Sequence, residues 1–280
     1  SISLPRPRAP LSSLEPGVYE RRQRIWLRYV ETEDEKLLSQ KQNKTEQEKA
    51  MLEKLRDITI YYTVDGQTPT SNSPIYTGEP FYLPAGKSTL KAVAVNGYGK
   101  VSNVMERTYQ VKTTFKHYFS DADNFNDFVI LSTSLDAFIK KFGTAQEEQE
   151  IQDDAVTGDC IRLMYSWGEA KFNMTDKGYT LYAVETDNPS MVGPRKTKIG
   201  MSETDVTELY RDMGQAHNQD GSRSIYYDSQ NKKYAMMYHL DAFNDRIDYI
   251  YYRADNGVVT LSYYLDNGRV AKMAIRCDFN

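Results

Sequence analysis

The residues whose side chains could do chemistry are few in this chain of 280 residues. The three histidines, His117, His217 and His239, show neither the HExxH nor the H-x₃-H spacing of zinc sites, and no cysteine lies near them. The stretch DADNFND, residues 121–127, begins like a calcium loop, but Phe125 stands at the third ligand position. We therefore predict no metal and no cofactor. An acidic linker is expected at 121–127, with a metal site there as the alternative.

Motifs of covalent or phosphate chemistry are also missing. The sequence contains no G-x-S-x-G elbow, no P-loop and no glycine-rich dinucleotide turn. Acidic residues are abundant, but a glycosidase needs two carboxylates about 5–10 Å apart across a sugar cleft, and sequence spacing cannot establish that separation. We predict that the chain has no catalytic residues and is not an enzyme, with activity in the C-terminal half as the alternative.

Aromatic residues in predicted loops are the best candidates for ligand binding, because sugar rings stack on exposed aromatic rings. Tyr76 lies in a polar loop, Tyr98 stands between two glycines, and Trp167 lies in a predicted turn. We predict these three as ligand-binding residues. The alternative is that their rings fill the loop-side edges of the core.

Composition limits the class of protein. Hydrophobic residues make up 40% of the chain and charged residues 26%, which is typical of folded domains, and the length favours two of them. The net charge of −4 and the absence of a long basic run argue against a nucleic-acid partner. No apolar stretch is long enough to span a membrane. The chain opens on Ser1 without a signal-peptide pattern, so we expect a piece of a longer, exported protein, located outside the cell or in its envelope.

The first domain, predicted at 1–112, reads as strands with one interruption. Alternating apolar residues predict a strand in RRQRIWLRYV, residues 21–30, and further strands in ITIYYTV, STLKAVAV and NVMERTYQV. Asp65-Gly66 and Asn96-Gly97 supply hairpin turns. Residues 31–57 contain no Gly or Pro and are rich in Glu, Lys and Gln, which predicts a helical insertion with a break near Asn43.

These motifs, in order, resemble the chitobiase/β-hexosaminidase C-terminal domain, which is an Ig-like, fibronectin-III-like sandwich. The resemblance rests on PGVYE, IYYTVDGQTPT, SPIYTGEPFYL and STLKAVAVNGYGKVSNVMERTYQV, and it covers residues 8–112 apart from the insertion. It implies an antiparallel sandwich that accompanies carbohydrate-active proteins. The resembled enzymes carry catalysis on a (β/α)₈ barrel, and the rest of this chain predicts meanders instead.

The second domain, predicted at 113–280, repeats one plan. Helices are expected near 135–142 and 203–213, where apolar residues recur at helical spacing and Gly143 and Gly214 follow as stops. The segment TAQEEQEIQDDAVTGD is predicted to be an acidic loop, and each helix leads into strands separated by turn residues such as Asn267-Gly268. We predict a mainly β protein whose second domain is α+β, with two helix-plus-antiparallel-meander repeats. The plan is similar to β-lactamase-inhibitor-protein and outer-membrane-assembly-lipoprotein folds, with IGMSETDV as the nearest local match.

Two hypotheses about function follow. The first is a non-enzymatic, exported bacterial surface module that contacts a protein or a cell-wall glycan. The second is a carbohydrate-binding accessory region of a glycoside hydrolase. Cys160 and Cys277 are the two cysteines, and strand alternation places them on opposite faces, which favours two free thiols over a disulfide.

Overall fold

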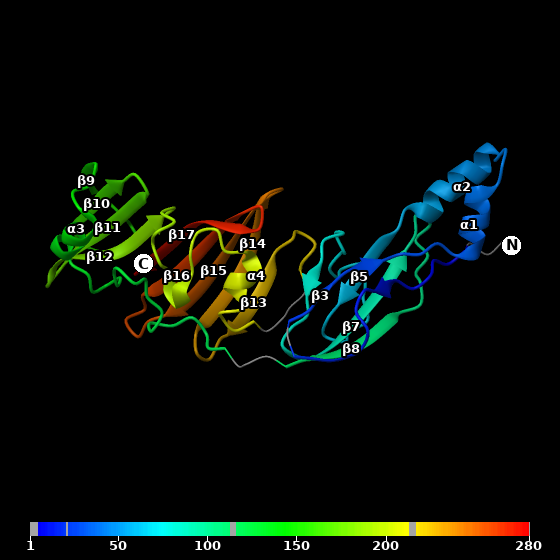
Figure 1. Ribbon diagram of the computed structural model, residues 1–280, viewed down its shortest axis with the longest axis horizontal. Helices are drawn as coiled ribbons and strands as arrows, with labels where there is room; N and C mark the ends of the chain where they lie inside the picture. The colour runs from blue at the N-terminus through cyan, green and yellow to red at the C-terminus, as the bar shows by residue number, and fades with distance from the viewer. Residues whose placement is uncertain (1–4, 21, 113–115, 213–216, 280) are drawn as a thin grey trace. The chain divides into compact units, whose positions relative to one another are not determined.

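The protein is mainly β and folds into two compact units (Figure 1). The N-terminal unit contains Ser1–Thr114 and Met213–Arg223, and the C-terminal unit contains Phe115–Asp212 and Ser224–Asn280. The computed structural model describes residues 5–20, 22–112, 116–212 and 217–279.

The N-terminal unit is a sandwich. One layer is a four-stranded sheet in the order β2-β8-β7-β5, and the short pairs β1-β4 and β3-β6 lie against it. Hydrophobic side chains from both sides, among them Ile25, Phe81 and Leu90, fill the space between the layers. The strands are β1 (Leu11–Ser12), β2 (Gly17–Tyr19), β3 (Arg24–Ile25), β4 (Leu27–Arg28), β5 (Thr59–Thr63), β6 (Phe81–Tyr82), β7 (Gly86–Val95) and β8 (Met105–Val111).

Two features of this unit differ from the sequence prediction. The strand predicted at 21–30 is divided into β3 and β4, because its two halves pair with different partners, β6 and β1. The pairing of β2 with β8 is parallel, whereas the other pairings of the unit are antiparallel. Strand β2 joins the edge that β8 would otherwise leave open, which provides partners for its backbone groups.

The insertion at 31–57 forms two helices, α1 (Glu33–Gln40) and α2 (Glu46–Arg56). A capping box opens each helix, and Asn43 between them has a φ of 56°, a conformation that asparagine tolerates better than most residues. Most of the helical surface is exposed, but Leu55 is buried and the N–H of Gly97 donates to the Lys54 carbonyl at 2.8 Å. The C-terminal end of α2 therefore packs on the turn that follows β7.

One antiparallel sheet of nine strands organises the C-terminal unit, in the order β13-β14-β15-β16-β17-β12-β11-β10-β9. Two meanders, β9 to β12 and β13 to β17, join along β12 and β17. The strands are β9 (Glu147–Ile151), β10 (Cys160–Tyr165), β11 (Gly168–Thr175), β12 (Gly178–Thr186), β13 (Arg223–Asp228), β14 (Lys233–Asp241), β15 (Asn244–Tyr252), β16 (Val258–Asp266) and β17 (Arg269–Asp278).

Each meander follows a helix, α3 (Leu135–Phe142) or α4 (Glu203–Thr207). Phe138 of α3 and Val206 of α4 belong to the same core cluster, so both helices cover one face of the sheet (Figure 1). Cys277 lies in that cluster and Cys160 in a smaller one, and both are free thiols.

Two predicted elements of the C-terminal unit are corrected by the structure. The acidic loop contains strand β9, whose glutamates are exposed because it lies at the edge of the sheet. Helix α4 ends at Thr207 instead of near residue 213, because the backbone beyond it bonds to other segments. The Leu209 carbonyl accepts from Arg195, and the Arg211 N–H donates to the His117 carbonyl. Gly214, the predicted stop, lies outside the described residues.

Candidate functional site

The three aromatic residues predicted to bind a ligand lie at separate places, and each takes part in packing. The Tyr76 ring packs edge-on against two rings of the sandwich core, with centroid distances of 6.3 and 6.4 Å. The Lys54 ammonium lies 5.0 Å from the ring centroid of Tyr98. Trp167 stacks on Tyr165 at 4.8 Å with an interplanar angle of 9°. Among the described residues, no ring contact joins any two of the three predicted residues.

A surface on the N-terminal unit combines arginine side chains with aromatic rings. It consists of Arg22, Arg24, Trp26 and Tyr82, and we call it the arginine–aromatic surface. Its position follows from the sequence, because burial alternates along the chain on either side of Ile25. Ile25 is fully buried, whereas 47% of Trp26 is exposed. An extended segment turns alternate side chains to opposite sides, so residues 24, 26 and 28 project outward.

The register between β3 and β6 fixes the geometry of the arginine–aromatic surface. Arg24 pairs directly with Tyr82, and directly opposite residues of an antiparallel pair share a face. The Arg24 guanidinium carbon lies 5.6 Å from the Trp26 ring centroid and 5.9 Å from that of Tyr82. The Arg22 guanidinium carbon lies 4.6 Å from the Tyr82 ring centroid. Cation–π attraction therefore links all four side chains.

Arg24 of this surface and the neighbouring Arg28 differ from other cations of the same unit, because neither has an acidic partner among the described residues. Arg56 pairs with Glu31 at 3.1 Å, and Lys112 lies 3.7 Å from a Glu20 oxygen. In contrast, within the described part of the chain no carboxylate lies within 4.0 Å of Arg24 or Arg28, and neither guanidinium donates a hydrogen bond. Arg24 and Arg28 thus carry positive charge that no acidic side chain in the described part of the chain neutralises.

A second aromatic group, which we call the tyrosine cluster, lies on the C-terminal unit and consists of Tyr227, Tyr234 and Tyr252. These residues come from the neighbouring strands β13, β14 and β15, with ring centroids 4.8 and 5.7 Å apart. Tyr227 is 68% exposed and Tyr252 is 44% exposed. Desolvation and the neighbouring tyrosines raise the pKa of Tyr234. The cluster offers aromatic contact area without a cation among its members.

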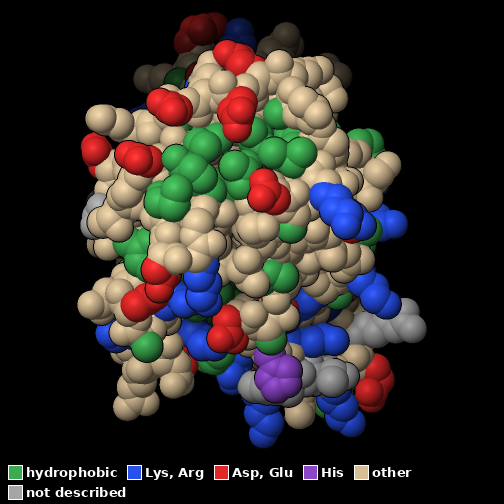
Figure 2. Space-filling model, turned by 90° about the vertical axis from the view of Figure 1, so that its left-hand side faces the viewer, with side chains coloured by type: hydrophobic (Ala, Val, Ile, Leu, Met, Phe, Trp, Pro, Cys, Tyr) green, Lys and Arg blue, Asp and Glu red, His purple; other side chains and the backbone are tan. Residues whose placement is uncertain are grey.

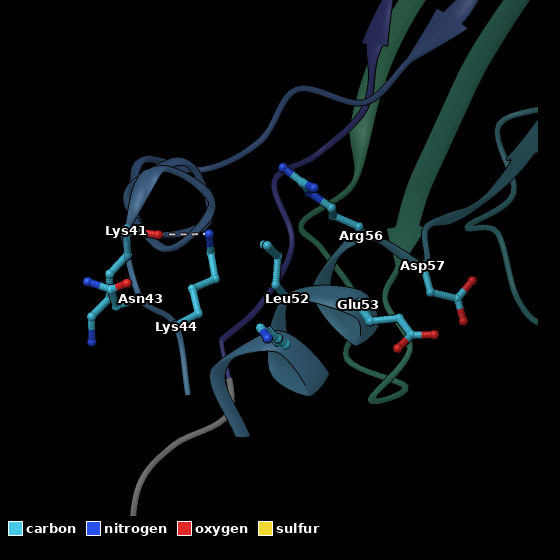
Figure 3. A pocket seen from close by; sticks show the side chains of 8 residues that line it. Lys41, Asn43, Lys44, Leu52, Glu53, Arg56 and Asp57 are labelled. Carbon is cyan, nitrogen blue, oxygen red and sulfur yellow. Dashed lines mark hydrogen bonds between the residues drawn. The ribbon is translucent and has the colours of Figure 1, made fainter. Parts of the chain in front are cut away.

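A pocket of about 980 Å³ opens beside the two helices of the insertion (Figure 3). Most of its cations are already engaged. Lys41 binds Glu48 at 2.6 Å, and Lys44 donates to the Lys41 carbonyl at 2.8 Å. Its lining residues are Lys41, Asn43, Lys44, Lys49, Leu52, Glu53, Arg56 and Asp57. Because positive and negative groups are mixed and mostly paired, this pocket is a weaker candidate for binding an anion than the arginine–aromatic surface.

Figure 2 faces the end of the C-terminal unit that carries α3 and β9. Hydrophobic side chains gather in the upper part of this view with Asp and Glu side chains around them. The edge strand β9 carries three exposed glutamates, Glu147, Glu148 and Glu150. Charged side chains along a sheet edge oppose pairing with another strand, so we assign these glutamates a protective role.

His239, the backbone of His117 and the acidic stretch at 121–127 form polar contacts within the C-terminal unit. His239 lies 2.8 Å from Asp245 at an exposed position, and the His117 carbonyl accepts from Arg195. Asp123 forms a two-pronged ion pair with Arg195, at 2.8 and 3.1 Å. Within the described residues, no group of three or more His, Cys, Asp or Glu side chains is arranged to hold a metal ion.

A comparison with known protein families finds one match. The family model of the chitobiase/beta-hexosaminidase C-terminal domain matches residues 40–106. It confirms, over these residues, the resemblance that the sequence motifs indicated, and the family's name relates this domain to carbohydrate-active enzymes. The match begins at the last residue of α1, includes α2 and strands β5 to β7, and ends within β8. The segment that contains Arg22, Arg24 and Trp26 lies outside it. Among the described helices, none has the length and apolar composition needed to cross a membrane.

Proposed function

We propose that this chain is a non-catalytic, glycan-binding accessory module of a larger bacterial protein that is exported to the cell surface or envelope. The observation that carries the proposal is the exposed ring of Trp26, flanked by the Arg24 guanidinium. An indole ring offers a flat apolar face to the C–H groups of a pyranose, and an adjacent guanidinium offers hydrogen-bond donors to the sugar oxygens.

The family match supports a role beside carbohydrate-active proteins, since the domain is defined at the C-termini of chitobiases and β-hexosaminidases. The arginine–aromatic surface lies in the same unit, and of its members only Tyr82 of β6 falls within the matched range. The family fold would thus supply the framework, and residues of this chain outside the matched range would determine which ligand binds.

A contact with another protein is the second candidate function. Leu240 and Phe243, at the tip of the β14–β15 hairpin, are 49% and 66% exposed. Exposed apolar side chains of this size favour a protein partner more than a sugar. A Leu240→Ser, Phe243→Ser double variant separates the two, because it leaves the arginine–aromatic surface unchanged.

Affinity electrophoresis tests glycan binding. The full chain is run through native gels that contain one polysaccharide each, both neutral and acidic. We expect at least one polysaccharide to retard the chain, and the Trp26→Ala variant to run at its unretarded rate in that gel. The hairpin double variant is the control and should be retarded like the unmodified chain. If no polysaccharide retards the chain, or if Trp26→Ala is retarded equally, the proposal is wrong.

Protease treatment of intact cells tests export, because a surface protein is digested and an internal one is not.

A further inference from the structure

We infer that the arginine–aromatic surface selects acidic sugars, with the carboxylate of a uronic-acid unit bound by Arg24 and the sugar ring stacked on Trp26. This inference rests on the proposed glycan-binding function and adds the chemical class of the ligand. It concerns residues that lie outside the matched family range, apart from Tyr82.

The first step is the state of the Arg24 guanidinium. Its contacts with Trp26 and Tyr82 are made through aromatic rings, at 5.6 and 5.9 Å from their centroids. Cation–π attraction to a ring leaves the N–H donors of the guanidinium plane unused, and no described residue accepts a hydrogen bond from them. The side chain is therefore held by its aromatic neighbours and keeps its donors available to a ligand.

The second step is the kind of group that matches these donors. A carboxylate accepts two parallel hydrogen bonds from one guanidinium, and such charge-assisted pairs are shorter and stronger than neutral ones. A hydroxyl of a neutral sugar would leave the positive charge without a counter-charge. Arg24 and Arg28 project from the exposed side of one segment, and both lack an acidic partner among the described residues. Local charge complementarity thus favours an anionic ligand at this surface, although the net charge of the whole chain is −4.

The third step distinguishes a carboxylated sugar from a nucleic acid. Binding to a polyphosphate depends on several Lys or Arg side chains that follow the phosphate backbone. The surface offers a short cationic segment beside one exposed indole ring, which matches a single charged sugar unit better than a run of phosphates. Single-stranded DNA is therefore the anion that should fail to bind.

Calorimetric titration of the full chain with defined oligosaccharides tests the inference. The probes are trigalacturonate, its methyl ester, a chitin trisaccharide and an oligothymidylate of matched charge. We expect trigalacturonate to bind at least about tenfold more tightly than its methyl ester, because the ester has the same rings without the charge. Added salt should weaken trigalacturonate binding, since the contact is exposed to solvent.

Variants connect this selectivity to individual residues. Arg24→Gln should weaken trigalacturonate binding about tenfold, and Arg24→Lys should restore only part of it, because an ammonium lacks the planar pair of donors. Lys100→Gln is the control for charge. Lys100 follows the ten-residue strand β7 at the end opposite β6, about 30 Å along the strand, and its loss should change binding less than about twofold.

Each outcome decides between the two proposals. Preference for the acid over its ester, lost in Arg24→Gln, supports the inference. Equal binding of the acid, the ester and the chitin trisaccharide overturns it and leaves the glycan-binding function standing. Binding of the oligothymidylate at equal or higher affinity also overturns it, in favour of a general anion site. Failure of every oligosaccharide and polysaccharide to bind rejects the proposed function itself.

Discussion

The ion pair between Arg195 and Asp123 should be a main support of the C-terminal unit, although it joins two loop segments. The two side chains are 19% and 10% exposed, and they meet through two hydrogen bonds of 2.8 and 3.1 Å. The Arg195 guanidinium also donates to the carbonyls of His117, Tyr118 and Leu209. One side chain therefore connects three backbone segments that are far apart in the sequence.

The expected losses of stability are unequal. Replacing Arg195 with Met leaves the Asp123 carboxylate buried with a backbone donor from Ser120, and it removes the donor from three carbonyls. Breaking a buried pair costs about 3–5 kcal/mol, and partial exposure to solvent lowers our expectation to about 2–4 kcal/mol. Asp123→Asn keeps one acceptor oxygen for the guanidinium, so it should cost less, about 1–2 kcal/mol. The φ of Arg195 is 55°, so Arg195→Gly should be less damaging than Arg195→Ala.

Urea unfolding followed by tryptophan fluorescence measures these losses in the correct unit. The chain has two tryptophans, one in each unit, so a Trp26→Phe background leaves Trp167 as the reporter of the C-terminal unit. Arg253→Met is the matched control. Arg253 pairs with Asp255 at 3.3 Å, but the two side chains are 35% and 49% exposed, and the loss should stay below about 1 kcal/mol.

The stability losses of Arg195→Met and Arg253→Met, compared with each other, show whether the ion pair supports the unit. If Arg195→Met lowers the free energy of unfolding no more than Arg253→Met does, the pair does not support the unit. A double-mutant cycle gives a second criterion. The losses of Asp123→Asn and Arg195→Met, added together, should exceed the loss of the double variant by about 1 kcal/mol or more. Additive losses would mean that the two side chains act independently.

Three further expectations concern packing and ionisation. In Gly97→Ala, the new Cβ would lie 2.8 Å from the Lys54 carbonyl oxygen, so α2 must move away. Thermal unfolding should therefore show that the variant is less stable by about 1–3 kcal/mol. Val206 of α4 is fully buried, whereas Leu209, just beyond the helix, is partly exposed. Urea unfolding of Val206→Ala should therefore show a larger loss of stability than that of Leu209→Ala. Burial raises the pKa of Cys277 to about 12 from an ordinary value of 9.0. The contribution of the protonated thiol to the free energy of unfolding is complete below about pH 9 and falls as the pH rises towards 12, so urea midpoints should decrease over that range. In the native protein, Cys277 should resist thiol reagents at pH 8.

Helix and turn signals in the sequence predicted the fold best where neighbouring residues alone determine the backbone conformation. Helix α3 has the predicted bounds, because Ser134 caps its start and Gly143 follows its end with a φ of 84°. Asn267 and Gly268 both have positive φ, as a two-residue hairpin turn requires. Asn96-Gly97 carries the same signal, yet neither residue has positive φ. There the N–H of Gly97 is bonded to helix α2, and this tertiary contact overrides the turn preference.

Edge strand β9 shows why a pattern of hydrophobicity can miss an element. A strand inside a sheet needs apolar side chains on at least one face, and this requirement produces the signal that is read in a sequence. Strand β9 is paired on one side with β10, and its burial pattern is exposed or intermediate at all five residues. Its glutamates are compatible with pairing and with solvent, so the segment has the composition of a loop.

The arginine–aromatic surface was hidden from sequence reasoning for a different reason. Alternation in the segment RIWLR already indicates that Arg24, Trp26 and Arg28 face one side, since Ile25 and Leu27 are the apolar members. The missing part is Tyr82, which reaches Arg24 only through the register of β3 with β6. That register depends on which short strands pair across the sandwich, and local sequence does not determine it. A cation held on aromatic rings without an acidic partner is a property of the folded unit, so the sequence prediction of Tyr76, Tyr98 and Trp167 could not include it.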